Sequence, residues 1–154
     1  MDNNSDKQMK KRTVSILILL TGVIVIAILT FPFPDIDIKL LGIGRHRYFL
    51  FHSAILPLAA VRIFRPLRRS GALRLLLLAL LMGFLTGVGI HLVTDIFQYK
   101  AVMFPFIGSL VDGTSADDRI WTAVNAILCF ASAGTLGYRR FRQQSDLDNY
   151  KQLH

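Results

Sequence analysis

Apolar residues gather along this chain into four long runs that are separated by short polar segments. The longest uninterrupted run covers about 20 residues, which at ~1.5 Å per residue matches the ~30 Å hydrocarbon core of a bilayer. The pattern predicts an all-α, polytopic membrane protein with four transmembrane helices, forming a single domain over residues 1–154. The predicted spans are 14–33, 48–64, 73–97 and 120–138.

The second of these runs is the weakest candidate, because it is short and contains His52, Pro57 and Arg62. Composition nevertheless supports a membrane protein, since 53% of the residues are hydrophobic. The formal net charge of +8 comes from basic residues clustered beside the apolar runs. Such clusters are typical of topology signals and of contact with anionic lipid, so we expect membrane lipid and no nucleic acid as partner.

The distribution of lysine and arginine predicts the orientation. Of the 18 residues, four precede the first run, five lie in the connector 62–74 and four follow the last run. By the positive-inside rule both termini are cytoplasmic, and the loops 34–47 and 98–119 share the outer face. We therefore expect a multi-pass protein of the cell membrane, typical of a prokaryote.

Three ionisable side chains of the predicted spans lie at similar depth below the outer surface. His52 lies near the start of the second span, and "HLVTD" places His91 and Asp95 near the end of the third. Residues four apart share a helix face, so His91 and Asp95 can close on one metal ion. Ionisable groups inside a membrane usually face a partner or a cavity, which favours a common site.

Each candidate also has a structural interpretation. Asp95 could simply orient His91 through a hydrogen bond, and Asp35 and Asp37 in "FPFPDID" could mark a polar helix exit. Arg45 and Arg47 could reach the lipid headgroups or bind substrate. The Ser53 hydroxyl could serve helix packing. The lone Cys129 excludes an intrachain disulfide and a thiolate metal cluster.

The order "PDID", then "HRYFLFHS", then "HLVTD" resembles the YdjM-like family of membrane-bound metal-dependent hydrolases, which is distantly grouped with zinc-dependent phospholipase C. The similarity covers residues 34–95. It implies a divalent ion, zinc or manganese, with Arg47 and Ser53 completing the motif. The metal candidates on this resemblance are Asp35, Asp37, His46, His52, His91 and Asp95.

The chain departs from the family at two points. Ile38 stands where a histidine commonly follows the DxD element, and the gap between His46 and Ser53 is one residue longer. The departures predict one metal ion instead of two, or none. In the leading interpretation the ion acidifies water, and a free aspartate such as Asp37, or His46, takes the proton. Arg45, Arg47 and Ser53 would bind the substrate, a phosphoester in a lipid headgroup.

Two other functions remain open. His52 and His91 could be the axial ligands of a haem. Alternatively, the chain could be a non-catalytic subunit or scaffold whose polar cluster only holds helices together.

The predicted topology can be tested by labelling single cysteines from either side of the membrane. We expect Ser115→Cys to be labelled from outside and Ser145→Cys only from inside, because they flank the fourth span. The opposite pattern would place the polar cluster on the cytoplasmic side.

Overall fold

Three long apolar helices form the frame of the structure, a computed structural model that describes residues 3–42, 47–64, 71–98, 103–104, 108–109 and 115–153. They are α1 (Asn3–Thr30), α4 (Gly71–Ile96) and α5 (Ser115–Leu153). Each contains a stretch long and apolar enough to cross a membrane: Met9–Thr30, Leu73–Ile96 and Asp118–Gln143. The prediction of a helical protein with membrane-spanning segments is confirmed for three helices that are long and apolar enough, and these correspond to three of the four predicted spans.

The second predicted span has a different form. Its helix, α3 (Ile55–Phe64), has only 10 residues, and an irregular segment, 47–54, precedes it. Four spanning helices are therefore not confirmed. Hydropathy alone could not show the difference, because the aromatic and aliphatic residues 48–51 continue the apolar run whether or not they are helical.

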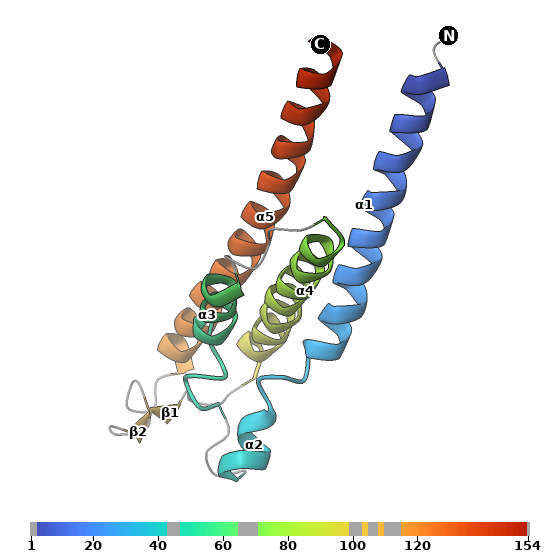
Figure 1. Cartoon of the computed structure of the whole chain (residues 1–154). Helices are drawn as coiled ribbons and strands as arrows, with labels where there is room; N and C mark the ends of the chain where they lie inside the picture. Colours follow the sequence, from blue (N-terminus) through green and yellow to red (C-terminus); the bar gives the residue numbers. More distant parts are fainter. Residues whose placement is uncertain are drawn as a thin grey trace.

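The remaining elements are short. Helix α2 (Ile36–Leu41) follows α1 after a turn. Strands β1 (Met103–Phe104) and β2 (Gly108–Ser109) pair antiparallel, with Met103 opposite Ser109. Both α2 and the strand pair lie at the end of the bundle opposite the start of α1 and the end of α5 (Figure 1).

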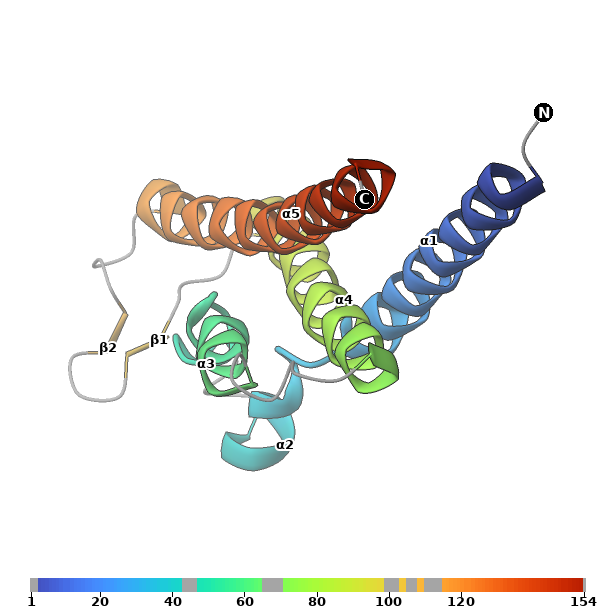
Figure 2. The same cartoon turned by 45° about the horizontal axis from the view of Figure 1, so that its top comes forward.

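Helix α4 is the central element and packs against both α1 and α5, as Figure 2 shows. Gly22 of α1 lies against Ala79 of α4, and farther along both helices Thr30 of α1 lies against Gly87 of α4. Because residue numbers increase in the same direction along both, α1 and α4 run parallel. Parallel neighbours need a connection that returns the chain to its starting end. Helix α2, the irregular segment and α3 lie in this connection.

The α1–α4 contact depends on two glycines spaced four residues apart, Gly83 and Gly87. A Cβ atom at Gly83 would meet Ile26, and one at Gly87 would meet Thr30 and the Ala27 carbonyl. Such a small-xxx-small pattern lets two membrane helices approach closely, where packing rather than water exclusion holds them together.

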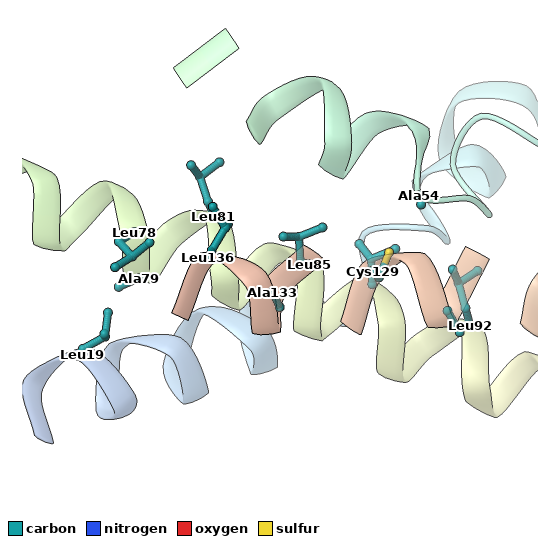
Figure 3. Packing of buried hydrophobic residues seen from close by; sticks show 12 residues of the cluster. Leu19, Ala54, Leu78, Ala79, Leu81, Leu85, Leu92, Cys129, Ala133 and Leu136 are labelled. Atoms are coloured by element: carbon teal, nitrogen blue, oxygen red, sulfur yellow. The ribbon is translucent and has the colours of Figure 1, made fainter. Parts of the chain in front are cut away.

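The apolar core lies mainly between α4 and α5. Leu85, Val88 and Leu92 of α4 are fully buried in one cluster with Cys129 and small residues of α5. Figure 3 shows Leu85 and Leu92 beside Cys129. By contrast, most of the large apolar side chains of α1 are exposed, including Leu17, Ile24 and Ile28. A surface of this kind suits contact with lipid.

We expect Gly87→Ala to lower the free energy of unfolding by about 1–3 kcal/mol, because the added methyl group forces α1 and α4 apart. The measurement is reversible unfolding in mixed detergent micelles, followed by circular dichroism. Gly134→Ala is the matched control, since Gly134 has no atom within 4 Å of the added Cβ. Equal effects at the two glycines would contradict the close α1–α4 contact.

Candidate metal centre

Three separate parts of the chain bring polar side chains together at the end of the bundle where α1 and α4 end. Asp35 directly precedes α2 and Asp37 lies in its first turn, and His52 comes from the irregular segment. His91 and Asp95 lie one turn apart near the end of α4. Apart from Asp35, these side chains are buried.

The two histidine rings form the middle of the cluster. Their centroids are 5.5 Å apart and the ring planes are inclined at 66°. Phe31, which follows α1 directly, packs on His91 with a centroid distance of 5.2 Å. The structure therefore places His52 beside His91 and away from lipid, although His52 lies in a loop and not on a helix.

Asp95 links the two histidines through one carboxylate oxygen. Its Oδ2 atom lies 3.4 Å from Nε2 of His52 and 3.5 Å from Nε2 of His91. Asp35 approaches the same nitrogen of His91, with Oδ1 3.6 Å from Nε2. Asp35, His52 and His91 can each offer a ligand atom, and these three atoms lie within 4.8 Å of one another.

These separations fit neighbouring ligands of one ion. Ligand atoms about 2.0–2.2 Å from a tetrahedral ion lie roughly 3.3–3.6 Å apart. They are also longer than the usual hydrogen bond between a ring nitrogen and a carboxylate. Among the described residues, Oδ2 of Asp95 and both ring nitrogens of His91 are buried without a hydrogen-bond partner. Donor type, spacing and burial therefore suit a divalent cation.

The other oxygen of Asp95 has a different partner. Arg47 places Nη2 3.1 Å from Oδ1 of Asp95, and the same nitrogen donates to the Asp95 backbone carbonyl at 3.1 Å. Only 2% of Arg47 is exposed, and its φ angle of 67° lies in the left-handed region. Such a backbone costs about 1–3 kcal/mol and persists only where surrounding contacts enforce it. The guanidinium was expected among headgroups or on substrate, whereas it lies against Asp95.

Asp37 is fully buried and contacts His52 on the side away from Asp95. Its Oδ2 lies 3.2 Å from Nδ1 of His52 and accepts the Tyr48 backbone N–H at 2.8 Å. A carboxylate behind the second ring nitrogen of a histidine is the usual way in which a metal-binding imidazole is oriented. With Nδ1 protonated toward Asp37, Nε2 presents its lone pair to Asp95 and His91.

Helix α5 fixes the irregular segment from the other side. Trp121 donates its indole N–H to the His52 carbonyl at 3.2 Å, and the Asn125 side chain accepts the Ala54 N–H at 2.9 Å. These bonds satisfy backbone groups that a helix would otherwise satisfy, which irregular backbone at membrane depth requires. Sequence reasoning missed both residues. A polar Asn125 inside a predicted span was the available signal.

Ser53 is buried, and its hydroxyl makes local bonds. It donates to the Leu50 carbonyl at 3.2 Å and accepts the Ile55 N–H at 3.2 Å. These bonds shape the start of α3. Arg45 and His46 lie outside the described residues.

No protein-family model, curated protein or solved structure matches the chain. The resemblance to the YdjM-like family therefore stays a prediction carried by its three motifs.

Proposed function

We propose that the chain is a membrane-bound metal-dependent hydrolase that holds one divalent ion between His52, His91 and Asp95. One observation carries the proposal. The buried Oδ2 of Asp95 faces Nε2 of His52 and of His91 at 3.4 and 3.5 Å, while Arg47 engages Oδ1. Burying a carboxylate oxygen that accepts no hydrogen bond is costly, and a cation shared with the two imidazoles removes that cost.

The donor set supports zinc or manganese. Two imidazole nitrogens and one carboxylate oxygen form a common set for a catalytic zinc ion, which keeps another position open. Manganese also accepts imidazole and carboxylate ligands. When bound, the ion supplies Lewis acidity that makes water a nucleophile near neutral pH.

The aspartates have distinct roles in this proposal. Asp37 is buried and holds Nδ1 of His52, so it positions a ligand. Asp35 has 42% of its side chain exposed and lies 3.6 Å from Nε2 of His91. It is therefore better placed than Asp37 to accept a proton from water entering from outside the bundle. A proton-transfer role for His46 stays a prediction.

The proposed substrate is a phosphoester in a lipid headgroup, and the proposed location is the outer face of the cell membrane. Support comes from the arrangement of the elements: the polar cluster lies at the end of the spanning helices, where lipid headgroups lie. The beginning of α1 and the end of α5 lie at the opposite end (Figure 1). With the lysine and arginine distribution, this supports four membrane passes with cytoplasmic termini.

The geometry favours a metal ion over the two alternatives. A haem between axial histidines needs its macrocycle between the rings. Here Oδ2 of Asp95 already lies within 3.5 Å of both Nε2 atoms. The scaffold alternative has one observation in its favour, because the Arg47–Asp95 and His52–Asp37 pairs join distant segments. Metal content separates these functions.

Purified protein in lipid nanodiscs, saturated with zinc and then desalted, should carry one zinc ion per chain by elemental analysis. His52→Ala, His91→Ala and Asp95→Ala should each remove it, because the site has few protein ligands. Asp37→Ala should weaken zinc binding about 10–100-fold in a chelator competition, the usual effect of removing a group that orients a metal-binding histidine.

Asp146→Ala is the control, since Asp146 is an exposed carboxylate on α5 outside the cluster. It should keep one zinc ion. Suppose instead that wild-type protein binds neither zinc nor manganese, and that the His91 and Asp95 variants only unfold at lower temperature. The cluster would then be structural, and the hydrolase proposal would be wrong.

A further inference from the structure

An apolar groove of about 370 Å³ runs along the surface between α1 and α4. Its walls are the stretch from Val23 to Phe31 on one side, and Thr86 and Ile90 of α4 on the other. At ~1.5 Å per residue the α1 wall is about 12 Å long. The groove lies within or directly beside the spans Met9–Thr30 and Leu73–Ile96.

The groove follows from the glycine contact between the two helices. Ala27, which lines the groove, has its carbonyl directly against Gly87. Small residues at this crossing bring the helix backbones together, and the longer side chains of Ile24, Ile28 and Ile90 stand on either side. A shallow apolar channel results.

One end of the groove meets the candidate metal centre. Phe31 lines the groove and also packs on the His91 ring, with a centroid distance of 5.2 Å. Ile90, on the opposite wall, directly precedes His91 in α4. A long molecule lying in the groove with its end at Phe31 would therefore place a polar group beside His91 and Asp35.

We propose that the groove binds an acyl chain of the substrate, so that the enzyme acts on a membrane lipid and not on a water-soluble phosphoester. This inference rests on the proposed function. The occupant follows from chemistry: the walls are apolar except for Thr86, and hydrocarbon surrounds spanning helices at this depth. The chain would orient the lipid along α1 and bring its headgroup to the exposed Asp35 carboxylate.

The test uses a photoactivatable lipid. Protein is reconstituted into phosphatidylcholine vesicles with a small fraction of phosphatidylglycerol carrying a diazirine in one acyl chain. After illumination, labelled peptides are identified by mass spectrometry. We expect labelling of Val23–Phe31 and of the Thr86–Ile90 stretch that excess unlabelled phosphatidylglycerol suppresses. Labelling at Ile127, an exposed residue of α5, should not saturate.

Thr86→Phe fills the groove and should abolish the saturable labelling. Thr135→Phe is the matched control, because Thr135 is exposed on α5 and its hydroxyl donates to the Ala131 carbonyl of its own helix. It should leave labelling unchanged. Equal labelling in the two variants, or labelling of the groove that never saturates, would overturn the proposal.

Zinc content of the same protein, measured after zinc saturation and desalting, separates the two proposals. Saturable labelling in wild-type protein that retains no zinc after this treatment would support the groove and contradict the metal centre. One zinc ion per chain without saturable labelling would support the metal centre and contradict the lipid groove.

Discussion

The structure depends on the partners that compensate the buried carboxylate of Asp95 near the end of α4. One carboxylate oxygen pairs with a buried arginine, and the other faces two imidazole nitrogens. A buried carboxylate is stable only when charge or hydrogen bonding compensates its desolvation. Much of the surrounding architecture can be understood as a means of keeping these partners in place.

The irregular segment before α3 shows this most clearly. Arg47 adopts a left-handed backbone, which a continuous helix would not allow, and His52 lies in a bend. The cost is offset by bonds from two separate helices: Asp37 of α2 accepts the Tyr48 N–H, while Trp121 and Asn125 of α5 bond to the backbone farther along. The close approach of α1 to α4 then places Phe31 and Asp35 over His91.

The sequence was sufficient to predict three long helices, because their apolar runs match the thickness of a bilayer. The meeting of His52, His91 and Asp95 could also be expected, since ionisable groups at similar depth in lipid need each other. The form of 48–64 could not be predicted, because its hydropathy is the same for a helix and for a buried loop. The position of Arg47 depended on a tertiary ion pair with Asp95, and Trp121 and Asn125 act through bonds to distant backbone. Each of these contacts joins residues far apart in the sequence, so none produces a pattern among neighbouring residues.

The central claim is that His52, His91 and Asp95 hold one divalent ion. Zinc K-edge X-ray absorption of protein loaded with one equivalent of zinc, in lipid nanodiscs, tests it most directly. The account predicts a first shell of nitrogen and oxygen only, at about 2.0–2.2 Å. It also predicts outer-shell scattering from two imidazole rings. A spectrum without imidazole scattering, or one that matches hydrated zinc, would contradict it.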